Sequence, residues 1–514
     1  MISAIGSTAR LWLSRFRGGR WPAGALPARR DLVIAAALVM LSLFVRLPVL
    51  HIVNDDEAFF SVMGQRWLHG EWPYAASFDV KPPLLFGVFA AAQAVFGLSL
   101  ATIKGLEIAF TAWGAIALQR LARRHGSEAL SLWAGGLYPV YSLAQQGVSE
   151  CSSVLQLPFV IAAFACVLAA DGGRFTRARL VAGGVMIGLA GLIKQTAIFE
   201  AAGLFAIVLW LHRERQPVRA ALFYGLGAVA PVAAFAGLFL AAGHLRDAYE
   251  AVIHTALMRM NYDVPGQDGH LGGGLARVLP LCKPLVVVSG LAAFSLARSA
   301  RIDDKLSPRL RLAAVVWAAS AAVALVLQHA MFAYYAAMLI PPLLILSGGL
   351  VMHGIAFSAQ VRTPAIAALA GLAVAVPLWL DRGNFTVGGY TGPGDFAAVE
   401  AAAAGLKQLG LRPSDRLLVL RRGLYTYVLT GALPSARYYH GLQLLCDFPL
   451  PDKAPLADAL ARRPRFIVSA DPAYGVNCER PEARPMIDGA LRGYNLKAVT
   501  RGAWDRMFIY EIKR

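Results

Sequence analysis

The feature that most constrains this chain is a succession of apolar stretches separated by short basic segments. An α-helix needs about 20 apolar residues to cross the hydrocarbon core of a bilayer, and eleven stretches approach that length. The composition agrees, because 57% of the residues are hydrophobic and only 16% are charged, against about 25% charged in a soluble domain. The sequence therefore predicts a polytopic α-helical membrane protein. The expected spans are residues 32–50, 104–122, 129–147, 152–170, 180–193, 197–211, 218–241, 278–297, 311–328, 333–353 and 363–380.

The net charge of +18 is best explained by membrane topology. A nucleic-acid-binding protein gathers its Lys and Arg on one soluble face, whereas here they lie between apolar stretches, so no nucleic-acid partner is expected. Basic loops beside spans face the cytoplasm, which predicts a cytoplasmic N-terminus at residues 1–30. An odd number of spans then predicts a periplasmic C-terminus in a bacterial inner (plasma) membrane. The clusters are Arg120, Arg123 and Arg124; Arg174, Arg177 and Arg179; Arg213, Arg215 and Arg219; and Arg298, Arg301, Lys305, Arg309 and Arg311.

One further apolar segment, residues 84–96, decides this topology. It has about 13 residues, too few for an ordinary crossing. If it were a span, every later loop would change sides and the basic clusters would lie outside. We therefore expect an interfacial or re-entrant helix here, within a transmembrane domain that covers residues 31–380.

Three segments on the predicted outer side are long enough to carry a function. Residues 51–83 form the first periplasmic loop, and residues 243–276 form a glycine-rich loop that could act as a lid over a substrate. Residues 381–514 are expected to form a small soluble α/β domain in the periplasm. Its helical patterns cover 394–409 and 455–462, and its strand-like runs cover 416–420, 465–468 and 507–512.

Acidic residues are concentrated in the first outer loop, where Asp55, Asp56 and Glu57 follow Asn54. Asn or Asp at the N-cap, with acids in the first turn, is a common way to begin a helix, so one interpretation is a solvated helix cap. The other is a group of catalytic carboxylates beside aromatic and cationic side chains. The local sequence leaves both interpretations open.

The wider pattern resembles a known family. Asp56-Glu57-Ala58-Phe59-Phe60, Gly70-Glu71-Trp72-Pro73-Tyr74 and Asp79-Val80-Lys81-Pro82-Pro83 resemble the first periplasmic loop of C-type (GT-C fold) membrane glycosyltransferases. The most similar members are the protein O-mannosyltransferase and lipid A aminoarabinose transferase-like enzymes. Further likenesses follow in the family's order: Glu150 at the outer end of a span, Gly188–Ala197 with Lys194, and Met331–Pro342 with Tyr334 and Tyr335.

The resemblance implies an inverting glycosyltransferase that moves a hexose or pentose from a polyprenyl-phosphate donor. The implied acceptor is lipid A, the lipopolysaccharide core, another glycan or a protein. The family's catalytic base maps to Asp56, while the neighbouring acids Asp55 and Glu57 remain candidates. The resemblance also implies two groups of binding residues: Lys81, Lys194, Arg259 and Tyr335 for the donor phosphate, and Glu150, Asp79, Gln195, Tyr74 and Tyr334 for the substrates.

The chemistry of such a donor explains why one base would suffice. A phosphate has a second pKa of about 6, so it can depart as an anion without being protonated. A glycosidase, by contrast, uses two carboxylates because one must protonate its leaving group. A base on the acceptor side, worth about 10²–10⁴-fold in rate, would therefore be combined with cations on the donor side.

Two alternatives come from other functional classes. A transporter or a flippase for lipid-linked sugars without transferase activity would also be polytopic, but transporters usually place charged groups near the bilayer midplane, often in repeated halves. A non-catalytic scaffold could use the tail to bind envelope partners. The concentration of acids in one outer loop favours the transferase.

Metal and cysteine chemistry are the last expectations from the sequence. No metal cofactor is required, although Asp55, Asp56 and Glu57 could together hold a divalent cation opportunistically.

Of the five cysteines, Cys446 and Cys478 lie in the predicted periplasmic tail, where disulfides form, and we expect them to be bonded to each other. The other three lie in or near spans and are expected to be packing residues.

Overall fold

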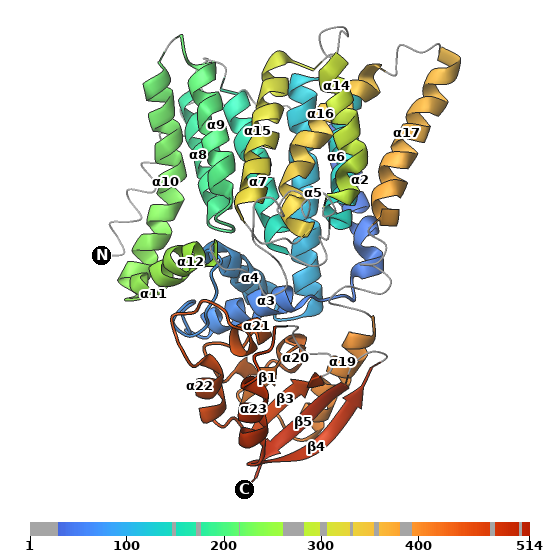
Figure 1. Ribbon diagram of the computed structural model, residues 1–514. Helices are drawn as coiled ribbons and strands as arrows, with labels where there is room; N and C mark the ends of the chain where they lie inside the picture. The colour runs from blue at the N-terminus through green and yellow to red at the C-terminus, as the bar shows by residue number, and fades with distance from the viewer. Residues whose placement is uncertain are drawn as a thin grey trace.

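The computed structural model describes residues 29–145, 151–170, 176–214, 216–260, 282–298, 306–328, 333–353, 359–380, 393–472, 478–502 and 506–513. A helical bundle occupies one end of the molecule and a β-sheet the other, with a layer of short helices between them (Figure 1). The bundle accounts for most of the chain. The layer and the sheet position the candidate site.

A helix lies in each of the eleven stretches that the sequence predicts to span the membrane. Among the described residues, five helices are long and apolar enough to cross a membrane by length and composition, and several apolar helices are shorter. The number of crossings therefore stays a prediction. The bundle helices are α2 (Arg29–Arg46), α5 (Leu100–His125), α6 (Glu128–Ala144), α7 (Cys151–Leu168), α8 (Thr176–Gly191), α9 (Ala197–Leu211), α10 (Pro217–Ala241), α14 (Val286–Arg298), α15 (Pro308–Leu327), α16 (Ile340–His353) and α17 (Ala359–Leu380).

Local sequence explains where several of these helices begin. The side chains of Ser99, Ser127 and Ser307 each accept a hydrogen bond from the backbone N–H three residues later, and so cap α5, α6 and α15. Small residues then allow close packing. A Cβ added to Gly184 or Gly188 of α8 would lie 2.1 and 2.3 Å from carbonyl oxygens of α10, so only glycine permits this approach.

Two short helices, one in residues 51–83 and the other in the apolar segment that follows, lie between the bundle and the sheet (Figure 1). They are α3 (Asp55–Leu68) and α4 (Pro83–Phe96). At about 1.5 Å per residue, the 14 residues of α4 reach about 21 Å, which is less than the roughly 30 Å of a hydrocarbon core. Helix α4 begins beside the turn after α8, where Leu84 N–H donates to Leu192 O over 3.0 Å.

The described C-terminal residues form a five-stranded mixed sheet with the order β2-β1-β3-β5-β4. Strand β1 is parallel to β2 and β3, and β5 is antiparallel to β3 and β4. Every residue of β3 is buried. The strands are β1 (Arg416–Leu420), β2 (Leu433–Pro434), β3 (Phe466–Ala470), β4 (Tyr494–Arg501) and β5 (Arg506–Ile512), and the helices are α19 (Pro393–Gln408), α20 (Tyr425–Thr430), α21 (Gly441–Leu445), α22 (Pro455–Ala461) and α23 (Ala483–Leu491).

The C-terminal domain packs directly on the first outer loop, and buried residues of both belong to one hydrophobic core. Hydrogen bonds also cross this boundary. Gln443 Nε2 donates to Phe78 O over 2.7 Å, and Arg66 donates to Ala436 O over 2.8 Å. The loop and the domain therefore form one packed unit rather than two tethered ones.

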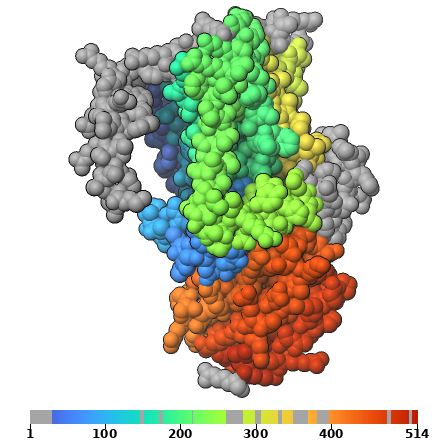
Figure 2. All heavy atoms as spheres, turned by 90° about the vertical axis from the view of Figure 1, so that its left-hand side faces the viewer, coloured from blue at the N-terminus to red at the C-terminus, as the bar shows by residue number. Residues whose placement is uncertain are grey.

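The first part of the predicted loop at residues 243–276 reaches the same unit after α10. It contains α11 (Leu245–Tyr249), a π-helical turn (Glu250–Thr255) and α12 (Ala256–Met260). In Figure 2 these helices, in light green, meet the orange C-terminal domain. The contact places the Arg259 guanidinium 4.2 Å from the centre of the Phe448 ring. Residues 261–276, the rest of the loop expected to act as a lid, lie outside the described residues.

Candidate functional site

The acidic run begins α3, and its first role is that of a helix cap. Asn54 Oδ1 accepts a hydrogen bond from Asp56 N–H over 2.7 Å, and Glu57 Oε2 accepts from Asn54 N–H over 3.3 Å. This is a reciprocal capping box. Successive residues of a helix point about 100° apart, so the three carboxylates leave α3 in different directions. The cap and the candidate site are thus built from the same residues.

Glu57 points away from solvent and into the bundle. Its side chain is fully buried, and its Oε2 lies 2.7 Å from Lys104 Nζ on α5. Lys104 also pairs with Glu107 at 3.3 Å, and Glu107 pairs with Arg46 of α2 at 3.0 Å. A carboxylate held in this network is not available as a base, so we assign Glu57 a structural role in fixing α3 on α2 and α5.

Asp55 faces the C-terminal domain. Its Oδ1 accepts a hydrogen bond from Leu424 N–H over 3.1 Å. Burial raises the pKa of Asp55, and the charges of His440 and Arg422 and the Leu424 hydrogen bond only partly oppose this effect. Because burial disfavours its ionised form and Leu424 N–H occupies its Oδ1, Asp55 is a weaker candidate for the base than a carboxylate whose pKa is lowered.

Asp56 remains 31% exposed, and His440 Nε2 lies 3.5 Å from its Oδ1. Burial among protein atoms opposes its charge, but the hydrogen bond and charge of His440, together with the charges of Lys81 and Arg259, outweigh burial and lower the pKa of Asp56. Asp56 is therefore an ionised carboxylate that solvent can still reach. Of the three consecutive acids, it has the properties that a general base requires.

The loop before α4 places a second carboxylate and a cation beside Asp56. Asp79 Oδ1 accepts from the backbone N–H of Lys81 over 3.2 Å. Burial raises the pKa of Asp79, an effect that Lys81 and Arg259 oppose and Asp56 reinforces. The Lys81 ammonium also lies 5.8 Å from the centre of the Phe60 ring. The structure thus brings together four predicted residues from three separate segments.

Tyr74 acts as a brace for this loop. It is fully buried, and its hydroxyl donates to Lys81 O over 2.8 Å. Its backbone has a φ of +71°, a conformation that a bulky side chain adopts only where its surroundings hold it. Burial, reinforced by the charge of Asp79, raises the pKa of Tyr74 well above its ordinary value, so the hydroxyl keeps its proton. We therefore assign Tyr74 to loop geometry rather than to direct substrate contact.

A second group lies at the turn between α8 and α9. Lys194 is 3% exposed. Its Nζ donates to Ser153 Oγ over 2.9 Å and lies 4.4 Å from the centre of the Tyr335 ring and 5.8 Å from that of Tyr334. These three predicted residues therefore form one cluster, with both tyrosines on the short 3₁₀ segment Ala333–Leu339 before α16.

Gln195 connects the two groups. Its amide nitrogen donates to Val80 O, next to Lys81, and to Val252 O at 3.3 Å in the π-helical turn before α12. It therefore ties the turn that carries Lys194 to the segments that carry Lys81 and Arg259. Glu150, the remaining predicted substrate-binding residue, lies outside the described residues.

The structure does not gather the acidic run into a cation site. Glu57 faces Lys104, so the three consecutive carboxylates do not converge on one point. Across the described part of the chain, no group of three or more His, Cys, Asp and Glu side chains could hold a metal ion. A solved neighbour does contain zinc, as reported below.

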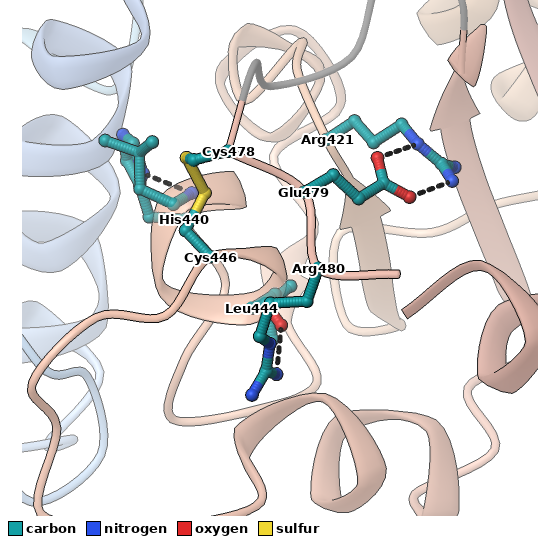
Figure 3. The surroundings of a disulfide bond; sticks show 8 residues. Arg421, His440, Leu444, Cys446, Cys478, Glu479 and Arg480 are labelled. Atoms are coloured by element: carbon teal, nitrogen blue, oxygen red, sulfur yellow. Dashed lines mark hydrogen bonds and ion pairs between the residues drawn. A yellow bond between two sulfur atoms is a disulfide. The ribbon is translucent and has the colours of Figure 1, made fainter. Parts of the chain in front are cut away.

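The C-terminal domain contributes a site residue that the sequence did not reveal. His440 lies in an ordinary-looking segment after two tyrosines, without a motif that marks it. It is the N-cap of α21, and Cys446 is the C-cap of the same helix. Cys446 is bonded to Cys478, 32 residues further along the chain. Figure 3 shows His440 beside this disulfide, and on its other side the ion pair between Glu479 and Arg421, whose closest atoms are 2.7 Å apart.

Comparison with solved structures identifies the fold. ArnT from Cupriavidus metallidurans bound to undecaprenyl phosphate superimposes with a TM-score of 0.63 and 14% identity, over 94% of this chain and 98% of ArnT. Apo ArnT gives 0.61 and 16% identity, over 93% and 97%. The oligosaccharyltransferase of Archaeoglobus fulgidus in the apo form gives 0.53 and 14% identity, over 87% and 70%.

These matches confirm the predicted resemblance at the level of the fold. The chain has the GT-C fold of ArnT and of the archaeal oligosaccharyltransferase over nearly its whole length. Another structure of the archaeal enzyme is a complex with zinc and sulfate. No family model matches the sequence, and no curated protein matches it.

Proposed function

We propose that this chain is an inverting glycosyltransferase that moves a sugar from a polyprenyl-phosphate donor to an envelope acceptor on the periplasmic side of the inner membrane. The observation that carries the proposal is the arrangement around Asp56. An ionised, solvent-accessible carboxylate lies among two cations, Lys81 and Arg259, at the boundary between the helical bundle and the C-terminal domain. The same fold is seen in ArnT bound to undecaprenyl phosphate.

The arrangement fits a direct displacement at the anomeric carbon. The acceptor hydroxyl attacks that carbon and gives its proton to Asp56, while the bond to the phosphate oxygen breaks and its electron pair leaves with the phosphate. Lys81 and Arg259 neutralise the charge that develops on the phosphate, which is the electrostatic stabilisation that dominates many enzyme sites. A single displacement inverts the configuration of the sugar. No general acid is needed.

The Lys194 group extends the proposed donor site toward the bundle. Lys194 is buried against Ser153 and the rings of Tyr334 and Tyr335, next to the turn that Gln195 ties to the Lys81 loop. A buried cation in or near a membrane needs an anionic or aromatic partner. We propose that Lys194 and Tyr335 bind the donor phosphate on the bundle side, with the prenyl chain between the apolar helices.

Charge distribution along the bundle supports the orientation. Arg123 and Arg124 end α5, Arg219 lies in the first turn of α10, and Arg309 in that of α15. These helix ends lie away from the C-terminal domain (Figure 1). By the positive-inside rule, that end faces the cytoplasm, and the Asp56 site and the C-terminal domain face the periplasm.

The function is tested by lipid and envelope-glycan mass spectrometry on a strain that lacks this chain. We expect one envelope acceptor to lose the mass of a single sugar and to regain it on complementation. Unchanged envelope glycans would contradict the proposal.

A second experiment distinguishes a transferase from a flippase. It combines detergent-solubilised protein, an extract of lipid-linked sugars and the acceptor that the deletion strain identifies. A transferase forms product in detergent, where no second compartment exists, whereas a flippase forms none.

A first prediction concerns the donor phosphate. Lys81→Gln removes a cation while keeping a polar side chain, and we expect it to weaken binding of undecaprenyl phosphate by roughly 10- to 100-fold, since a charged hydrogen bond contributes about 1.5–3 kcal/mol. The measurement is a titration of protein in lipid nanodiscs with undecaprenyl phosphate. The control is Lys407→Gln, an exposed lysine at the end of α19. If the wild type and both variants bind undecaprenyl phosphate with equal affinity, Lys81 does not contribute to the donor site.

A further inference from the structure

The C-terminal domain places a histidine against the proposed base. His440 Nε2 lies 3.5 Å from Asp56 Oδ1, and the His440 side chain is only 16% exposed. Its ring meets that of Phe59 edge-on, with the ring centres 5.3 Å apart. Phe59 lies on α3 one turn after Asp56. The helix that carries the carboxylate therefore also orients the histidine.

The hydrogen bonds of His440 identify which ring nitrogen carries the proton. Its Nδ1 accepts from Leu442 N–H over 3.2 Å. In the neutral ring, a nitrogen that accepts leaves the proton on the other nitrogen, and in the protonated ring both nitrogens carry one, so Nε2 is protonated in either form. The Nε2–H group therefore faces Asp56 as a donor.

His440 is held in place from both ends of α21. At its own end, the ring caps the helix through Leu442. At the other end, Cys446 is bonded to Cys478, and within the helix Gln443 donates to Phe78 O over 2.7 Å. Preorganised groups of this kind keep their geometry during a reaction without a further entropic cost.

The charges around His440 come from two elements. Burial opposes a charge on the ring, but the hydrogen bond and charge of Asp56, with the charges of Asp55 and Asp79, outweigh burial and raise the pKa of His440. Asp55 and Asp56 lie on α3, and Asp79 lies on the loop before α4. Each of these acids can therefore influence a titration of His440.

Positively charged groups surround the Asp56 carboxylate. Asp56 faces His440 from the C-terminal domain, Lys81 from the loop before α4 and Arg259 from α12, and Arg422 acts on the neighbouring Asp55. Among these groups, His440 is the one that lowers the pKa of Asp56 most, and its Nε2 lies 3.5 Å from Asp56 Oδ1. It can therefore orient the carboxylate as well as stabilise its charge.

We propose that His440 is the positioning residue of Asp56, so that the C-terminal domain completes the catalytic site from the side opposite the membrane. This inference rests on the proposed function. During transfer, the acceptor proton moves to Asp56, and His440 keeps its own proton on Nε2. The His440 ring beside Oδ1 holds that carboxylate oxygen so that the other points at the acceptor. The domain is therefore a part of the site and not an appended module.

Two substitutions of His440 test whether it positions Asp56 or only caps α21. His440→Asn keeps an N-capping side chain but is too short to reach Asp56. His440→Gln places an amide N–H near the position of Nε2. We expect transfer by His440→Asn to fall by roughly 10- to 100-fold, the cost of a misplaced catalytic group, and transfer by His440→Gln to recover most of that loss. Binding of undecaprenyl phosphate should be unchanged in both, since His440 does not contact the donor side.

The pH profile gives a readout that a structural role would not change. Loss of the His440 donor raises the pKa of Asp56, so the acid limb of the rate against pH should move to higher pH in His440→Asn.

The pKa of His440 is measured directly by NMR on full-length protein labelled with ¹⁵N-histidine in nanodiscs. The His440 resonance is assigned from its absence in His440→Asn. In Asp56→Asn, the pKa of His440 should fall by about 1–3 pH units, as expected when an adjacent opposite charge is removed.

The outcomes distinguish this inference from the proposed function. Loss of transfer in His440→Asn with recovery in His440→Gln supports the positioning role, and so does a lower His440 pKa in Asp56→Asn. Full transfer by His440→Asn, or a His440 titration that Asp56→Asn leaves unchanged, would overturn the inference while the transferase stands. A wild-type protein that forms no product would overturn the proposed function, whatever the histidine titration shows.

Discussion

Asp56→Asn is expected to lower transfer by about 10²–10⁴-fold, the usual contribution of a general base, while binding of undecaprenyl phosphate is retained. The amide occupies the same volume and can present an oxygen to His440, so the fold should not change. It cannot take up the proton of the acceptor hydroxyl. The measurement is the rate of product formation by purified protein, with the glycan mass spectrum of a complemented deletion strain as the cellular counterpart.

Asp55→Asn is the matched control, because it makes the same chemical change one residue earlier. Asp55 accepts from Leu424 N–H, and an asparagine carbonyl can accept that bond as well. We therefore expect a transfer rate within a few-fold of the wild type. The reverse result, in which Asp55→Asn abolishes transfer and Asp56→Asn does not, would move the base to Asp55.

Lys104→Met is expected to cause the largest loss of stability. Lys104 is 4% exposed and neutralises two buried carboxylates, at 2.7 Å from Glu57 and 3.3 Å from Glu107. Without it, Arg46 alone balances both acids. Removing one partner of a buried ion pair destabilises a protein by about 3–5 kcal/mol. The measurement is the midpoint of thermal unfolding in detergent, together with the yield of membrane-inserted protein.

Two further variants test whether charge balance is the cause. The double variant Lys104→Met with Glu57→Gln leaves the Arg46–Glu107 pair neutral, so it should recover most of the stability that Lys104→Met loses. Arg213→Met removes an ion pair whose side chains are 57% and 81% exposed, and exposed pairs contribute about 0–1 kcal/mol. A double variant no more stable than Lys104→Met would show that packing, not charge, explains the loss.

The first outer loop shows which features of the candidate site could be predicted from sequence motifs. The sequence offered a helix cap and a catalytic cluster as alternatives, and in the structure the cap is present while the same residues also build the candidate site. The sequence mapped the base to Asp56 through the family resemblance but kept Asp55 and Glu57 as candidates. Their roles differ because a helix turns about 100° per residue, which directs one to Leu424, one to His440 and one to Lys104.

In the C-terminal tail, likewise, the sequence predicted individual elements but not their arrangement. Apolar runs at 416–420 and 507–512 coincide with β1 and β5 to within a residue, because buried strands leave a compact local signal. The order of the strands is not local. Strand β1 lies between β2 and β3, and β5 between β3 and β4, an arrangement that depends on pairing and packing among all five strands.

The sequence by itself determined the membrane character, the positions of the apolar helices and the loop that carries the candidate site, because the cost of placing polar groups in lipid marks each segment locally. The tertiary structure alone decided which partners surround each acid and in which direction the pKa of each one shifts. Asp55 and Leu424, for example, are separated by 369 residues, and His440 comes from the same distant domain. Such contacts depend on the packing of one domain on another, and no pattern within either segment records them.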